Sequence, residues 1–171
     1  MKTWSKGQLS MGIYQGTSSF FIFERMNWRD DWLWGLALIV LNVVIHVIGL
    51  ALINQKAAGM FRHITSHRHT TVVFALVMGT LTLLVTSLHA LEAGIWATAY
   101  RLLGALPDNK TAMLYSLNAL TSYGHENLVL ENRWQLMGAI EALNGWLLFG
   151  LTTAFLFGMM EKVWVMGNKR T

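Results

Sequence analysis

Three long apolar stretches dominate the pattern of hydrophobic and polar positions along the chain. They cover residues 32–53, 70–100 and 136–160. A helix needs roughly 20 apolar residues to cross a bilayer, and each stretch provides them. The pattern therefore predicts an all-α integral membrane protein with three transmembrane helices. Residues 1–31 are apolar only in short patches, so we expect a lead-in there, followed by one membrane domain over residues 32–171.

A shorter helix is predicted between the second and third spans, over residues 109–120. Pro107 blocks continuation of the preceding helix, and Asp108 is a favourable N-cap. At about 1.5 Å per residue the helix reaches only about 18 Å, well short of the roughly 30 Å hydrocarbon core. It must lie at the membrane surface or dip into the bilayer and return.

The polar segment 121–127 follows this short helix and is rich in oxygen ligands. Non-helical backbone at membrane depth is tolerated only where protein buries it or where it faces water. The C-terminal end of a helix that enters from outside carries partial negative charge and favours a cation below it. Carbonyls of the following turn can replace a cation's hydration shell. Residues 108–130 therefore read as a re-entrant pore helix and a filter-like loop.

Composition supports the membrane assignment and narrows the function. Hydrophobic residues make up 54% of the chain and charged ones 13%, whereas a soluble domain has roughly 25% charge. Cysteine is absent, which excludes disulfides and thiolate metal sites. The net charge of +4 is diffuse, so we expect no nucleic-acid partner. The motifs of phosphate-binding loops, serine hydrolases and zinc proteases are missing, so no enzyme is predicted.

Positive charge is densest in two places, which predicts the topology. The connection 54–69 holds three Lys or Arg and no acid, and the C-terminal tail holds three against one acid. By the positive-inside rule both segments lie in the cytoplasm. We therefore expect a multi-pass protein of the cell inner membrane, with its N-terminus and second connection outside.

Several short sequence motifs follow one another between residues 107 and 157. They are Pro107-Asp108, Tyr115-Ser116, residues 120–124 (Leu-Thr-Ser-Tyr-Gly), 134–136 (Trp-Gln-Leu), 140–145 (Ile-Glu-Ala-Leu-Asn-Gly) and 150–157 (Gly-Leu-Thr-Thr-Ala-Phe-Leu-Phe). In these features residues 88–164 resemble the bacterial potassium-channel-like proteins that have two pore-flanking helices and a pore loop. The subgroup with one extra leading helix is the most similar.

The resemblance implies a homotetramer that passes monovalent cations, potassium or a similar ion, without a cofactor. The ion filter would comprise Thr121, Ser122, Tyr123, Gly124 and His125, with Glu126 and Asn127 at the outer mouth. Gly150, Thr153 and Phe157 would line the inner cavity or gate, and Glu92 and Glu141 would support the pore.

The filter segment departs from the family pattern Thr-Thr-Val/Leu-Gly-Tyr-Gly-Asp. His125 stands in place of the Tyr, and Glu126 replaces the second Gly. A Cβ resists backbone conformations that Gly permits, so Glu126 argues against an unmodified potassium filter. A ring of His125 and Glu126 would instead form a carboxylate-lined, pH-sensitive cation site.

Alternatives remain at this stage. A non-conducting accessory membrane subunit fits the same pattern. A haem-binding electron carrier would use His46 and His89, although we expect His46 deep in the membrane and His89 nearer its outer side. Glu92 would either mark function or pair structurally with Arg101 near the outer boundary.

Glycines and histidines outside the filter also have two interpretations each. Gly145, Gly150 and Gly158 would be gating hinges or small residues that allow helix packing. The connection's histidines, His63, His67 and His69, would bind a transition metal weakly or face lipid headgroups.

Overall fold

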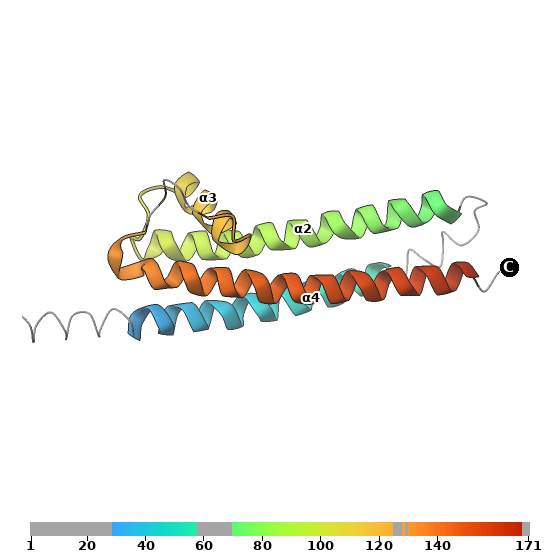
Figure 1. Cartoon of the computed structure of the whole chain (residues 1–171), viewed down its shortest axis with the longest axis horizontal. Helices are drawn as coiled ribbons and strands as arrows, with labels where there is room; N and C mark the ends of the chain where they lie inside the picture. The colour runs from blue at the N-terminus through green and yellow to red at the C-terminus, as the bar shows by residue number, and fades with distance from the viewer. Residues whose placement is uncertain (1–28, 58–69, 125–127, 129, 169–171) are drawn as a thin grey trace, which may run out of the picture.

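The computed structural model describes residues 29–57, 70–124, 128 and 130–168 (Figure 1). These residues form α-helices joined by short connections, as the sequence predicts. The first helix covers Arg29–Ala57, α2 covers Thr70–Leu102, α3 covers Asn109–Leu120 and α4 covers Gln135–Asn168. A 3-10 turn, η1 (Asn132–Trp134), leads into α4.

Three of these helices are long and apolar enough to cross a membrane: the first helix, α2 and α4. They run along the long axis of the molecule, and α3 lies at the end where α2 finishes and α4 begins (Figure 1). The predicted bounds 109–120 match α3. The three long helices begin up to three residues before the predicted spans and end two to eight residues after them. Multi-pass membrane architecture is thus supported by three candidate spans.

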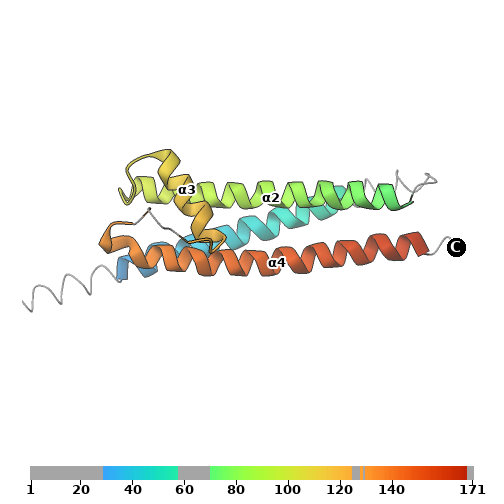
Figure 2. The same ribbon diagram turned by 45° about the horizontal axis from the view of Figure 1, so that its top comes forward.

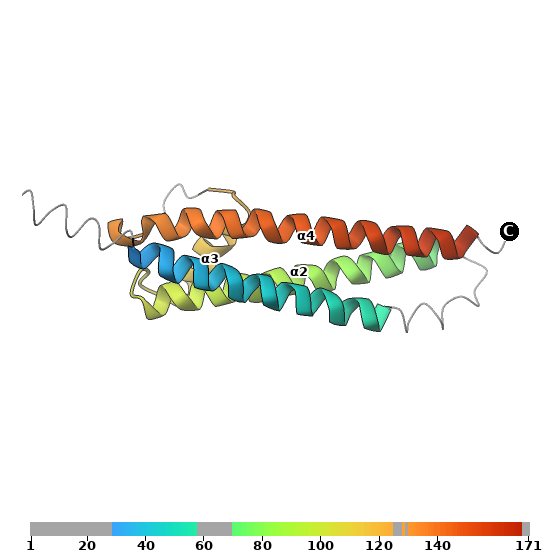
Figure 3. The same ribbon diagram turned by 90° about the horizontal axis from the view of Figure 1, so that it is seen from below.

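Glycines let the first helix approach both of its long neighbours. A Cβ on Gly35 would lie 2.8 Å from the side chain of Ile140 in α4, and one on Gly49 would lie 2.6 Å from Leu88 in α2. Figure 3 shows the first helix crossing α2 while α4 runs alongside. Small residues at such crossings permit the close backbone packing on which membrane helices depend.

The short helix α3 has a defined start and a defined end. Asp108 adopts an extended backbone, and its carboxylate accepts hydrogen bonds from the Thr111 amide at 2.9 Å and the Thr111 hydroxyl at 2.6 Å. At the other end, Ser122 and Gly124 have positive φ angles of 54° and 93°. These left-handed residues stop the helix and turn the chain.

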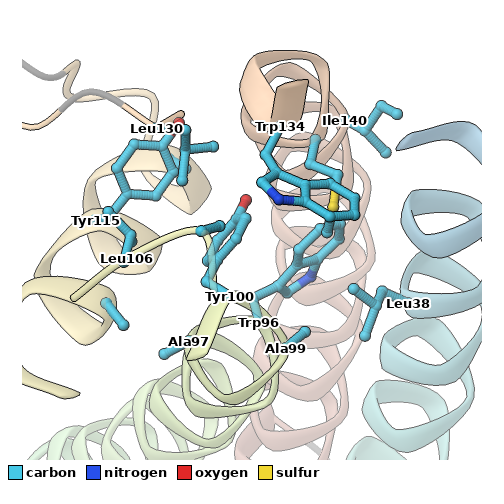
Figure 4. Close-up of a cluster of buried hydrophobic side chains, with 14 residues drawn as sticks. Leu38, Trp96, Ala97, Ala99, Tyr100, Leu106, Tyr115, Leu130, Trp134 and Ile140 are labelled. Atoms are coloured by element: carbon cyan, nitrogen blue, oxygen red, sulfur yellow. The ribbon is translucent and has the colours of Figure 1, made fainter. Parts of the chain in front are cut away.

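Aromatic side chains form the core at the junction of α2, α3 and α4 (Figure 4). Tyr100 and Tyr115 meet edge to face with ring centroids 5.3 Å apart, and Trp96 lies 6.1 Å from Tyr100. Trp134, just before α4, packs in the same cluster. This core fixes α3 against the two long helices that flank it.

Candidate pore loop and buried polar junction

The end of α3 rests directly on α4 at Gly145. A Cβ at this position would lie 2.0 Å from the Leu120 carbonyl oxygen, so only glycine allows the contact. Gly145 is ten residues beyond Gln135, which places it about 15 Å along α4. Figure 2 shows α3 slanting from the end of α2 toward α4. The short helix therefore reaches well along the bundle from the end at which it starts.

The chain then returns to the beginning of α4. Leu130 is buried beside Tyr115, and both pack on Gly138, where a Cβ would meet the Tyr115 hydroxyl at 2.1 Å (Figure 4). Leu120 and Leu130 thus contact α4 at Gly145 and Gly138, which are about two turns apart along that helix.

The described part of the predicted filter is exposed in a single copy. Thr121, Ser122, Tyr123 and Gly124 are all exposed, and Tyr123 is 84% accessible. The Thr121 hydroxyl turns back to donate to the Leu117 carbonyl at 2.7 Å, and the Ser122 hydroxyl accepts from the indole of Trp146 at 3.0 Å. The other three predicted residues, His125, Glu126 and Asn127, lie outside the described residues.

Glu141 sits behind α3 and joins three helices. Its side chain is fully buried, and its carboxylate accepts hydrogen bonds from Ser116 in α3 and from Tyr100 in α2 at 2.6 Å. The Ser116 hydroxyl also lies 2.8 Å from the Ala93 carbonyl oxygen. One carboxylate in α4 thereby fixes the position of α3 relative to both long helices.

The residues assigned to the inner cavity lie on an exposed face of α4. Gly150, Thr153 and Phe157 follow helical spacing, and a Cβ on Gly150 would meet nothing within 4 Å. Gly158 is equally open, so neither glycine is needed for packing within this chain. Nearer the end of α3, a cavity of about 570 Å³ is bordered by α2, α3 and α4, including His89 and Trp146.

Sequence analysis missed a buried polar junction that connects the three long helices. Glu92 is fully buried in α2, with Oε1 2.8 Å from Nδ1 of His46 and Oε2 3.1 Å from Nδ1 of His89. On the far side of both imidazoles, the Thr152 hydroxyl of α4 lies 3.0 Å from Nε2 of His89 and 3.2 Å from Nε2 of His46. Two imidazoles thus bridge one carboxylate and one hydroxyl.

Two expectations about these residues are wrong. His46 and His89 do not lie at different depths, because their ring centroids are 5.1 Å apart. Glu92 does not pair with Arg101, which instead donates to Asn109 at 3.0 Å and to the Leu106 carbonyl at 2.7 Å. The error in depth arose because the first helix begins three residues before its predicted span, α2 ends two residues after its own, and the two helices cross at an angle. Residue counts from the predicted ends therefore misplace the levels of His46 and His89.

The same geometry disfavours the haem alternative. A haem iron bound by two histidines lies between their rings, with the porphyrin plane separating them. Here the rings of His46 and His89 pack against each other at 5.1 Å, tilted by 37°, and both direct Nδ1 to the same carboxylate. The histidines of the connection, His63, His67 and His69, lie outside the described residues.

A partial signal for the junction was present in the sequence. Asn42 and His46 are spaced i, i+4 in the first helix, and His89 and Glu92 are spaced i, i+3 in α2, so each pair shares a helix face. Intramembrane polar residues usually face protein, which predicts that the two faces meet. Thr152 gave no such signal, because a hydroxyl in an apolar helix commonly bonds to its own backbone.

Comparison with known proteins found no relative of this chain. No protein-family model, no curated protein and no solved structure matches this chain.

Proposed function

We propose that the chain is one subunit of a passive monovalent-cation channel, with α3 as a re-entrant pore helix. The observation that carries the proposal is the contact of the Leu120 carbonyl with Gly145. It holds the C-terminal end of a twelve-residue helix about 15 Å along a helix long enough to span the membrane. That arrangement delivers helix-end carbonyls to the bilayer interior, where they favour a cation.

The segment after α3 would supply the filter. Thr121, Ser122, Tyr123 and Gly124 follow the helix end directly, and their exposed backbone supplies carbonyl oxygens as ion ligands. The Thr121 hydroxyl is engaged with α3, so its carbonyl is the better ligand. His125 would complete the filter, and Glu126 and Asn127 would shape the outer mouth.

The exposed loop supports an assembly of several copies. Polar non-helical backbone at membrane depth must be enclosed by protein or face water, and one copy leaves residues 121–124 open. A homotetramer, as the family resemblance implies, would close four loops around one axis. In that ring the face of α4 with Gly150, Thr153 and Phe157 would line the inner cavity.

Glu141 and Glu92 would act as supports behind the pore. Glu141 holds α3 through Ser116, and Glu92 holds the leading helix through His46. By the positive-inside rule, the density of Lys and Arg would put the C-terminus in the cytoplasm of a bacterial cell and the filter on the outer side.

The test is cation flux through the purified protein in liposomes, with potassium, sodium and a bulky organic cation compared. We expect the two small cations to pass and the bulky one to be excluded. Glu126→Gln should change the rate or the ratio of the small cations, because it removes the charge at the mouth. The control Glu131→Gln, at an exposed carboxylate paired with Arg133 at 3.1 Å, should leave both unchanged.

A silent liposome that contains verified tetramers would overturn the proposal. It would favour the alternative of a non-conducting accessory subunit, in which the same loop serves assembly.

A further inference from the structure

The buried junction has the donor set of a metal site. His46, His89 and Glu92 each offer one ligand atom, and these atoms all lie within 4.8 Å of one another. Two imidazole nitrogens and one carboxylate oxygen suit divalent transition metals, and zinc takes this set in tetrahedral sites with an open position. We propose that His46, His89 and Glu92 bind one divalent transition-metal ion, with zinc the best match, between the first helix and α2.

The distances at Glu92 fit coordination of one ion. Its Oε2 atom is buried and has no hydrogen-bond donor, although Nδ1 of His89 is only 3.1 Å away. The pair is close but not aligned for a hydrogen bond. Two ligand atoms that each lie about 2.0–2.1 Å from a tetrahedral metal are roughly 3.3 Å apart, so a small shift places both on one ion.

Thr152 completes the site from the third helix. A histidine that binds metal through Nδ1 carries its proton on Nε2 and usually donates it to an oxygen. Both Nε2 atoms converge on the Thr152 hydroxyl oxygen, at 3.0 Å from His89 and 3.2 Å from His46. A hydroxyl oxygen has two lone pairs and accepts both bonds. The position of Thr152 is therefore compatible with the tautomer that metal binding requires at both histidines.

Charge also favours a cation here. A carboxylate in the bilayer interior is costly unless it is compensated. Among the described residues, every Lys and Arg lies in the first or last two turns of a helix or in a connection: Arg29, Lys56, Arg101, Lys110, Arg133 and Lys162. None of these reaches Glu92. A divalent ion supplies the missing positive charge at the carboxylate itself.

The site has an access route and a structural consequence. His89 is 32% exposed and borders the 570 Å³ cavity next to the end of α3, so an ion can reach the junction from that side. Because His46 belongs to the first helix and the other two ligands to α2, bound metal fastens the leading helix to a pore-flanking helix. This inference does not depend on conduction.

The experiment uses full-length protein in which His63, His67, His69 and His125 are replaced by Asn. Of the six histidines in the chain, only His46 and His89 remain. The purified protein is stripped with a chelator and titrated with cobalt(II) as a spectroscopic substitute for zinc. We expect one cobalt per chain with the visible absorption of a four-coordinate site, displacement by zinc, and a higher thermal unfolding midpoint with metal.

Three variants in this background locate the site. His46→Gln and Glu92→Gln should abolish the cobalt spectrum, and Thr152→Val should weaken binding by about 10–100-fold. Glu141→Gln, at the other buried carboxylate of the bundle, should bind as tightly as the background. Absence of cobalt and zinc binding in the background protein, whose junction is intact, would overturn the proposal. Binding that persists in both His46→Gln and Glu92→Gln would overturn it as well.

Discussion

At the residue scale, two buried carboxylates, Glu92 and Glu141, each connect neighbouring helices of this bundle. Glu92 contacts the first helix through His46, and Glu141 contacts α2 and α3 through Tyr100 and Ser116. Both side chains are fully buried. Removing a carboxylate from water is offset only when hydrogen bonds satisfy its oxygens, so each acid constrains its neighbours closely.

Glu141→Leu should lower the free energy of unfolding by about 1–3 kcal/mol, because it leaves the buried Tyr100 hydroxyl without an acceptor. Glu141→Gln keeps one acceptor oxygen and should cost less. The measurement is the thermal unfolding midpoint of the detergent-solubilised protein. Equal midpoints for Glu141→Leu and the wild-type protein would contradict this account of the contact.

The polar residues themselves were visible in the sequence, but their partners were only partly predictable. The family resemblance gave Glu141 a supporting role behind the pore helix, and the structure places it on α3. The pairing of Glu92 with His46 joins residues 46 positions apart, and it depends on the crossing of two helices. Helix periodicity fixes which face a residue occupies, not the level at which two faces meet.

At the scale of elements, α3 depends on two local features, its N-cap and its contact with Gly145. The cap could be predicted from Pro107 and Asp108, and the predicted range agrees with α3. The long helices end beyond the predicted spans because a helix does not have to stop where its apolar stretch stops. The Leu120–Gly145 contact could not be predicted, since it arises from packing between elements.

The cap of α3 should respond to acid. Hydrogen bonds from the Thr111 hydroxyl and amide hold the pKa of Asp108 below its ordinary value of 3.8. A lowered pKa in the folded state means that the ionised carboxylate stabilises the fold above its unfolded pKa, and that this stability is lost as pH falls through the folded pKa. The unfolding midpoint of the wild-type protein should therefore exceed that of Asp108→Ala most at neutral pH.

The difference between these two proteins should shrink as pH falls from about 6 to about 3. Asp108→Asn is the matched control, because it keeps a capping oxygen without a titrating group. A difference that stays constant over this range would show that the charge of Asp108 does not contribute.

Gly145 and Gly150 form a matched pair in α4. Gly145→Ala places a methyl group 2.0 Å from the Leu120 carbonyl, so α3 must shift, at a cost of about 1–3 kcal/mol. Gly150→Ala meets nothing within 4 Å and should be neutral or stabilise the helix by up to about 1 kcal/mol. Unfolding midpoints of both variants test the contact. If Gly145→Ala were as stable as Gly150→Ala, α3 would not rest on α4 as described.

At the scale of the whole molecule, a single copy leaves the non-helical residues 121–124 exposed. The sequence pattern correctly predicted three long apolar helices and the short helix α3. The meeting of α2, α3 and α4 in one aromatic core, and the polar junction beside it, required the three-dimensional arrangement. Assembly and ion passage involve neighbouring copies, and they stay predictions of the sequence pattern and the loop geometry.

The absence of cysteine from the chain makes one measurement especially direct. Tyr123→Cys introduces a thiol into the filter segment, and Leu102→Cys introduces one at the end of α2, at sites with 84% and 83% exposure in one copy. Each variant is reconstituted in liposomes, and potassium flux is measured before and after a bulky cationic thiol reagent. If the loop lines a pore, the reagent should suppress flux through Tyr123→Cys and leave Leu102→Cys unaffected. Flux that survives complete modification of Tyr123→Cys would contradict the central claim, because ions would then pass elsewhere.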